Sequence, residues 1–190
     1  MTRADSAVAD DLARLYDVDL QEDPGDLDLY RALAARTGGP ILELGVGSGR
    51  LAVPLAAAGH LVTGVDIEPA MLRRARERAT RAGRTALANL TLVEGDARAL
   101  SVAVGPFRLA YIALSSLLVF GSRAEQRRAV RTLADHLAPG GLAAVDVWLP
   151  DADDLARYDG RLGLEYTRRD PETGDVVRSE ERRVGKECRL

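Results

Sequence analysis

The stretch Pro40–Ala57 reads PILELGVGSGRLAVPLAA, and it decides the fold. Its apolar start, residues 41–44, is typical of a strand buried on both faces, although Glu43 interrupts it. Three glycines follow at every second position: Gly45, Gly47 and Gly49. Residues 51–57 are good helix formers, with Pro54 still inside the first turn. A strand, a glycine loop and a helix start together predict a site for a nucleotide-like ligand.

The spacing of these glycines is G-x-G-x-G behind an acid, whereas dinucleotide pyrophosphates are usually held by G-x-G-x-x-G. A Glu43 carboxylate would repel a pyrophosphate and favour a cationic amino-acid group. These residues resemble the first motif of the class I S-adenosylmethionine-dependent methyltransferases. The resemblance implies that Glu43 and the three glycines hold the methionine part of S-adenosyl-L-methionine. Arg50 either helps to close the loop or is a plain surface arginine.

The composition indicates one domain of ordinary globular character. The 190 residues are 46% apolar and 29% charged, and the net charge of −3 gives no reason to expect nucleic acid as a partner. No apolar run approaches the roughly 20 residues of a membrane span, and acids occupy the N-terminus where a signal peptide needs an apolar core. We therefore expect a cytoplasmic protein without a membrane partner. One cysteine excludes an internal disulfide framework and a cysteine-based metal cluster, and no metal site is predicted.

A second acid stands at the end of the next predicted strand, residues 61–65. Asp66 follows Gly45 by 21 residues, the separation at which an acid can accept both ribose hydroxyls of a bound nucleotide. The segment DIEPAML, which starts at Asp66, resembles the methyltransferase pattern. The resemblance implies that Ile67 lies on the adenine ring and that Met71 lines the pocket.

A third acid follows the predicted strand 90–93. The resemblance implies that Asp96 accepts the adenine amino group and that the Ala97 backbone N–H meets the ring. The alternative for Asp96 is the N-cap of a helix that begins at Arg98. The strand 107–113 ends at Ala113, which is also expected beside the cofactor. The segment 114–118 should line the methyl-acceptor side, because ligands lie beyond the carboxyl ends of strands.

Helices are predicted to surround these strands. They are expected over residues 7–16, over 27–36 with Asp26 as cap, over 71–82, and from the capping box at Ser122 to Leu137. A fifth strand is expected over residues 142–148. The helix 71–82 carries five arginines, read as a solvated face, with an acidic docking partner as the alternative. Tyr16 either belongs to a lid that folds over the cofactor, as the family resemblance implies, or is a core aromatic.

The end of the chain differs in character from the rest. Residues 151–177 are interpreted as the start of a β-hairpin insertion, which in similar small-molecule methyltransferases roofs the substrate site. Residues 178–189 resemble the translation of a common sequencing adapter, so 178–190 are interpreted as a non-native tail and Cys188 is not regarded as a nucleophile. The antiparallel strand pair that ends the family's sheet is then missing, and the chain is expected to be C-terminally truncated.

The sequence therefore predicts an α/β doubly wound, Rossmann-like fold with five parallel strands. N-terminal helices (1–39) precede a cofactor-binding core (40–150), and the resemblance implies methyl transfer from S-adenosyl-L-methionine to an N, O or C atom of a small molecule. One alternative is an NAD(P)-dependent dehydrogenase, which shares the glycine loop and the distal acid. Another is a cofactor-binding remnant without catalysis. The acceptor, any general base and the oligomeric state do not follow from the sequence.

Overall fold

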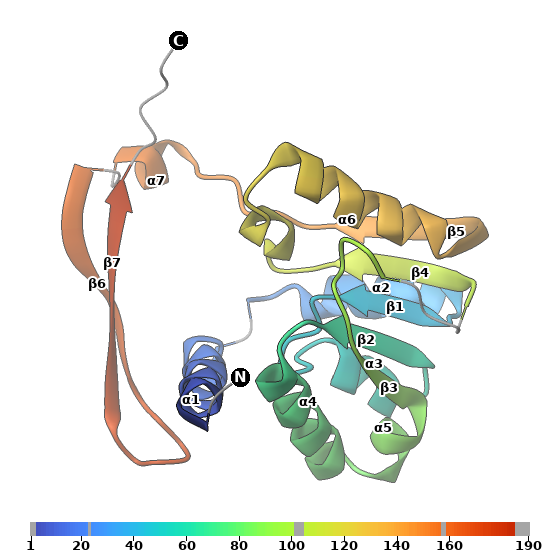
Figure 1. Cartoon of the computed structure of the whole chain (residues 1–190), viewed down its shortest axis with the longest axis horizontal. Coiled ribbons are helices and arrows are strands. Elements are labelled where there is room, and N and C mark those ends of the chain that lie inside the picture. Colours follow the sequence, from blue (N-terminus) through green and yellow to red (C-terminus); the bar gives the residue numbers. More distant parts are fainter. Residues whose placement is uncertain (1–2, 23, 101–104, 157–158, 185–190) are drawn as a thin grey trace.

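The structure is a computed structural model that describes residues 3–22, 24–100, 105–156 and 159–184 (Figure 1). Helices precede and separate the first strands: α1 (Arg3–Asp19), α2 (Leu27–Thr37), β1 (Ile41–Leu44), α3 (Ala52–Ala57), β2 (Val62–Asp66), α4 (Pro69–Ala82), α5 (Arg84–Asn89) and β3 (Leu90–Glu94). The second half holds β4 (Phe107–Ile112), a 3₁₀ turn η1 (Ser116–Val119), α6 (Arg123–Asp135), β5 (Leu137–Val145), α7 (Ala152–Ala156), β6 (Asp159–Arg169) and β7 (Val176–Val184).

Five strands form one parallel sheet in the order β3-β2-β1-β4-β5. The chain runs outward from β1 to β3 and then returns to the other side of β1 with β4. The strand order therefore reverses between β1 and β4, which is where ligands bind in sheets of this kind. The predicted doubly wound, Rossmann-like fold with five parallel strands is confirmed. Within the described residues β5 lies at an edge of the sheet.

Helices cover both faces of the sheet (Figure 1). On one face Tyr30 and Ala34 of α2 pack with α3 against β1 and β4, and the rings of Tyr30 and Tyr111 lie 4.4 Å apart. On the other face Ala129 and Leu133 of α6 pack against the alternate residues of the same strands. Because β1 is buried on both faces, its four side chains are all buried, as the apolar run predicted.

Several element boundaries differ from the predictions. The helix α1 is longer at both ends than residues 7–16, and the short helix α5 was not expected. The strand β5 begins at Leu137, because Leu137 already pairs with Phe107 before the register shifts around Pro139–Gly141. Asp26 does not cap α2 with its side chain, since its carboxylate instead binds the Arg50 guanidinium at 2.5 and 2.6 Å.

The strands β6 and β7 form a separate antiparallel hairpin that stands beside α1 (Figure 1). The predicted turn at residues 170–175 joins them. Residues 178–184, interpreted above as a non-native tail, pair with β6, whereas residues 185–190 lie outside the described part of the chain. The foreign origin of 178–190 and the four-part division of the chain stay predictions. None of the described helices has the length and hydropathy needed to cross a bilayer.

Candidate functional site

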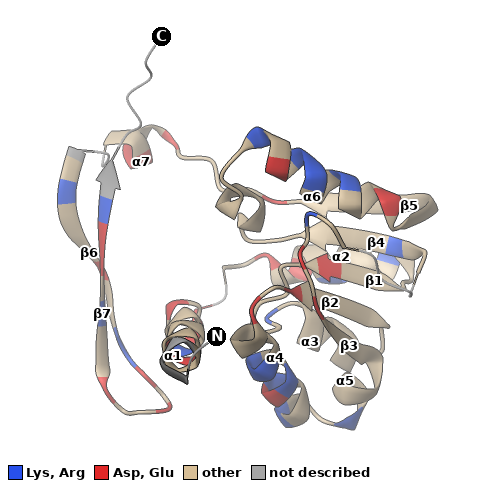
Figure 2. Ribbon diagram, in the orientation of Figure 1, with Lys and Arg blue, Asp and Glu red and all other residues tan. Residues whose placement is uncertain are grey.

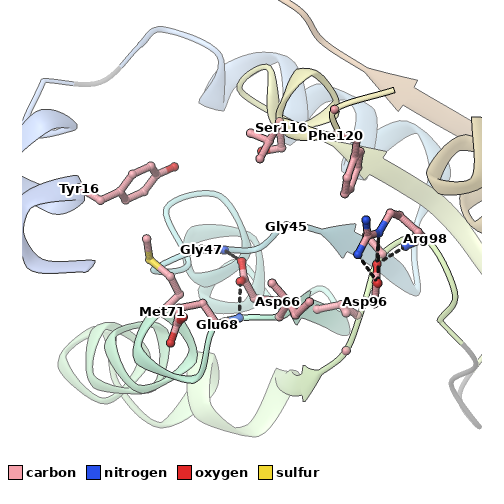
Figure 3. Close-up of a pocket in the computed structure, with 16 residues that line it drawn as sticks. Tyr16, Gly45, Gly47, Asp66, Glu68, Met71, Asp96, Arg98, Ser116 and Phe120 are labelled. Carbon is pink, nitrogen blue, oxygen red and sulfur yellow. Dashed lines mark hydrogen bonds and ion pairs between the residues drawn. The ribbon is translucent and has the colours of Figure 1, made fainter. Parts of the chain in front are cut away.

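A cavity of about 480 Å³ opens at the carboxyl ends of the central strands (Figure 3). It lies at the reversal of strand order, and both the α1 helix and the η1 turn reach it. Eight of the residues predicted for cofactor binding line it: Tyr16, Gly45, Gly47, Asp66, Ile67, Met71, Asp96 and Ala97. Tyr16 and Met71 lie toward one end of the cavity, and Asp96 lies toward the other (Figure 3). The structure thus brings together four segments: the helix α1, the glycine loop, the end of β2 with the start of α4, and the turn after β3.

The carboxylate of Asp66 joins the glycine loop to the end of β2. One oxygen accepts the Gly47 N–H at 2.8 Å, and the other accepts the Glu68 N–H at 2.9 Å (Figure 3). Gly47 has φ of +53°, and a Cβ there would lie 3.7 Å from the Tyr16 ring. A carboxylate oxygen has two lone pairs, so each oxygen of Asp66 can still accept a hydroxyl from a ligand.

Asp96 is held by Arg98 at the opposite end of the cavity (Figure 3). The Arg98 guanidinium donates to Asp96 at 2.7–3.1 Å, and the Arg98 backbone N–H donates to the same carboxylate at 2.8 Å. The hydrogen bonds from Arg98 lower the pKa of Asp96, so this side chain is an anion at neutral pH. The described residues that follow Asp96, up to Leu100, form a turn. The Arg98 N–H that donates to Asp96 closes this turn, so within these residues Asp96 does not cap the helix given above as the alternative.

Arg98 also connects this end of the cavity to the next helix. It donates to Glu125 of α6 at 2.5 Å, and its guanidinium lies 5.7 Å from the centre of the Phe120 ring. Glu125 itself belongs to the capping box that was predicted, since its backbone N–H donates to Ser122 Oγ at 3.2 Å. The wall beside Asp96 is therefore built from two segments far apart in the sequence, residues 96–98 and 120–125.

Glu43 lies behind the glycine loop and does not line the cavity. Its side chain is buried, and it accepts a hydrogen bond from the Tyr111 hydroxyl at 3.0 Å. Burial raises the pKa of Glu43 to about 8, because the charged form is poorly solvated there. Burial therefore favours the protonated form of Glu43 at neutral pH in the structure without ligand, and the role of Glu43 toward the methionine part stays a prediction.

Three more predicted residues lie outside the cavity lining: Gly49, Arg50 and Ala113. Gly49 has φ of +80°, and a Cβ there would lie 2.9 Å from Val53 Cγ2, so this glycine allows α3 and α4 to pack closely. Arg50 binds Asp26 and so ties the loop to the start of α2. Ala113 is buried in the core.

The segment after β4 forms the remaining wall. Leu114 and Ser115 have φ of +49° and +58°, a conformation that is unusual for residues other than glycine. Asp146 accepts the Ser115 N–H at 3.3 Å, and the Trp148 N–H donates to Ser115 Oγ at 2.8 Å. This strained turn places Ser116 beside Gly45, at the position predicted for the acceptor side.

Sequence reasoning missed seven lining residues: Val65, Glu68, Gly95, Arg98, Val119, Phe120 and Gly121. Arg98 carried a usable signal, because an arginine two residues after an acid in a turn can fold back onto it. Phe120 and Gly121 carried none, since only the path of the chain after η1 brings them to the cavity. Among the described residues no group of three acids, histidines or cysteines could hold a metal ion.

The comparisons found a relative without an assigned function and solved structures of methyltransferases. An uncharacterized protein of Mycobacterium tuberculosis is 35% identical over 116 residues, which are 61% of this chain and 39% of that protein. A glycopeptide N-methyltransferase solved with S-adenosyl-L-homocysteine has a TM-score of 0.59 and 26% identity, covering 84% of this chain and 65% of its own. An amino pentose methyltransferase of Micromonospora echinaspora, solved with S-adenosylmethionine, has a TM-score of 0.56 and 29% identity, covering 73% and 54%.

The chain therefore spans less than two thirds of the length of each of these proteins. The sequence profile of the methyltransferase domain family matches residues 41–141, more than half of the chain and the whole of the parallel sheet except its last residues. The class I methyltransferase resemblance noted in the glycine loop and the two distal acids is thereby confirmed: this chain belongs to the methyltransferase domain family.

Proposed function

We propose that this chain binds S-adenosyl-L-methionine in the cavity beside β1 and transfers its methyl group to an N, O or C atom of a small molecule. The observation that carries the proposal is the Asp66 carboxylate, fixed by the Gly47 and Glu68 N–H groups at the mouth of the glycine loop. Both of its oxygens keep acceptor capacity for the two hydroxyls of a ribose.

The remaining lining residues fit the rest of this cofactor. The ionised Asp96 can accept an adenine amino group, Ile67 offers an apolar surface to the ring, and Met71 and Tyr16 close the other end. Gly45 and Gly47 leave room for the methionine part, because a Cβ at either position would take up space in the cavity beside the loop. We assign Glu43, Gly49, Arg50 and Ala113 a supporting role behind the loop. They shape it without touching the ligand.

Methyl transfer demands positioning more than side-chain chemistry. When bound, S-adenosyl-L-methionine supplies a methyl group that is already activated by its positively charged sulfur. The chain has to align an acceptor with that methyl group and exclude water, and alignment alone can account for much of the rate enhancement. Ser116 and Val119, which follow the strained turn at Leu114–Ser115, form the part of the wall that would face the acceptor.

A small-molecule acceptor is favoured over a macromolecule by two observations. Two of the similar solved proteins are a glycopeptide N-methyltransferase and an amino pentose methyltransferase. The cavity is also a bounded volume of about 480 Å³ and not an open basic groove. Because the chain spans less than two thirds of the length of these proteins, this part of the proposal concerns an enzyme of their full length.

Calorimetric titration with S-adenosylhomocysteine tests the cofactor half. We expect binding to the unaltered chain and at least about tenfold weaker binding to Asp66→Ala, because hydrogen bonds from a ligand to a charged group are lost. The matched control is Asp28→Ala, which removes a carboxylate that is 90% exposed on α2. Equal affinity of the Asp66→Ala and Asp28→Ala variants would contradict the proposed site.

Three further outcomes separate the alternatives. Binding of NADH but not of S-adenosylhomocysteine would favour the dehydrogenase alternative, which shares the loop and the distal acid. Transfer of an isotope-labelled methyl group to amino-sugar or peptide-derived acceptors by the chain would support the proposed reaction. Cofactor binding with no transfer to any acceptor would instead favour a cofactor-binding remnant.

A further inference from the structure

The arginines of α4 form the solvated face predicted from the sequence only in part, because Arg74 and Arg78 are partly buried. Arg73 binds Asp10, and Arg74 and Arg78 both bind Asp17, so three of the five contact acids of α1. Figure 2 shows the basic positions of α4 in blue and the acidic positions of α1 in red. Arg76 and Arg81 are exposed. The partner of this basic helix is therefore another part of the same chain.

Asp17 connects α1 directly to the glycine loop. One of its oxygens accepts the Ser48 hydroxyl at 2.5 Å and Arg78 at 3.0 Å, and the other accepts Arg74 Nε at 2.6 Å. Ser48 lies inside the loop and is buried. The preceding residue, Tyr16, lies over Gly47 in the cavity wall. The position of Tyr16 therefore depends on how firmly Asp17 is held.

Arg74 extends this network to the β6–β7 turn. While its Nε binds Asp17, its two terminal nitrogens bind the carboxylate of Glu172, which lies in that turn. The Arg74 side chain is only 15% exposed, so its charge is shielded from bulk solvent more than that of a surface arginine. One guanidinium thus joins three elements that are distant in sequence: α1, α4 and the hairpin.

The hairpin is attached to the rest of the molecule through polar contacts at this end. Arg14 of α1 binds Asp170, which is fully buried, and Arg168 donates to the Val18 and Asp19 carbonyl oxygens. Gln21 donates to the Arg169 carbonyl oxygen at 3.0 Å. Each of these polar contacts can be either formed or broken, so a change in one element can alter the contacts of the elements that share it.

We propose that Arg74 is a positioning residue that couples the β6–β7 hairpin to the cofactor loop through Asp17, so that cofactor binding and docking of the hairpin favour each other. The coupling is reciprocal, because any ligand that stabilises one arrangement of a linked pair is bound more tightly in it. This inference rests on the proposed cofactor site. It adds that a residue of the hairpin, which does not line the cavity, influences affinity for the cofactor.

Glu172→Gln is the most informative variant, because Glu172 is half exposed, lies in a turn and does not line the cavity. We expect it to weaken S-adenosylhomocysteine binding about threefold to fivefold, and Arg74→Met to weaken binding more. In the Arg74→Met background the Glu172→Gln change should have no further effect, since its partner is already gone. Additive effects of the two changes would overturn the proposed coupling.

Two matched controls remove charges nearby without touching the network. Asp175→Asn lies in the same turn and Arg76→Met lies on the same helix, and both side chains are exposed. Each should bind S-adenosylhomocysteine like the unaltered chain. If these controls weaken binding as much as Glu172→Gln does, the effect reflects net charge and the inference is wrong.

Hydrogen exchange measures an effect that is not expected if Arg74 only stabilises the fold, namely protection of the hairpin amides by the ligand. In the unaltered chain, S-adenosylhomocysteine should slow exchange of the β6 and β7 amides, and this protection should disappear in Arg74→Met. Protection of the cavity residues without any change in the hairpin would overturn the inference while leaving the cofactor site intact. Failure of the unaltered chain to bind S-adenosylhomocysteine would instead defeat the proposed function itself.

Discussion

Glu43 is buried beneath the glycine loop, and the burial raises its pKa to about 8 from an ordinary value of 4.5. Between these two pH values the folded chain holds a proton that the unfolded chain has released. The stability contributed by this group is therefore fully present below about pH 4.5 and is lost as the pH rises toward 8. Between about pH 4.5 and 8 the free energy of unfolding should therefore fall by on the order of 1 kcal/mol per pH unit. We expect Glu43→Gln to remove this fall.

Urea denaturation at several pH values measures this decline. The amide that Glu43→Gln introduces keeps an oxygen to accept the Tyr111 hydroxyl, so the variant should still fold, although its absolute stability is not the readout. Glu77→Gln, an exposed position on α4, should retain the pH dependence of the unaltered chain. An unchanged pH slope in the Glu43→Gln variant would mean that Glu43 is ionised in the folded chain at neutral pH.

The start of α6 is fixed by its own sequence. Ser122 has extended backbone angles, its hydroxyl accepts the Glu125 N–H, and the Glu125 carboxylate lies 3.0 Å from the same hydroxyl. We expect Ser122→Ala to lower the free energy of unfolding by about 1 kcal/mol, because one orphan N–H loses its partner. Chemical denaturation measures this change. Thr80→Ala serves as the control, because the Thr80 hydroxyl donates to the Arg76 carbonyl oxygen within α4. It should change the free energy of unfolding by less than about 0.5 kcal/mol.

On the scale of the whole molecule, stability differs between the sheet and the hairpin. The strand β1 is paired on both sides and buried on both faces, whereas β6 and β7 have one partner each and expose Leu162, Leu164 and Val176 by more than half. A two-stranded ribbon is marginal by itself. Without ligand, we expect β1 amides to exchange at least about 100-fold more slowly than β6 and β7 amides.

Native-state hydrogen exchange resolved by mass spectrometry measures this difference. The β4 amides serve as an internal reference, because β4 also has two neighbours in the sheet and should behave like β1. Equal protection of the hairpin and the sheet would contradict the expectation. It would show that the hairpin unfolds only together with the whole molecule.

The sequence by itself determined the sheet and most of the cavity. The short run of apolar residues, the glycine spacing and the turn residues act over a few positions, so Ile41–Leu44, the glycine loop and the hairpin turn could be predicted. Asp66 and Asp96 could be placed together because parallel strands end at one edge of the sheet. The family resemblance then indicated what such an edge binds.

The tertiary structure decided the partners of the charged side chains. Arg98 meets Glu125, Arg50 meets Asp26, and Arg74 meets both Asp17 and Glu172, and no local pattern specifies these pairs. The same holds for Glu43, whose charge depends on how completely α3 and β4 remove water from it. Hydrophobic periodicity is a local property of the chain, whereas desolvation and ion pairing arise only when distant segments pack together.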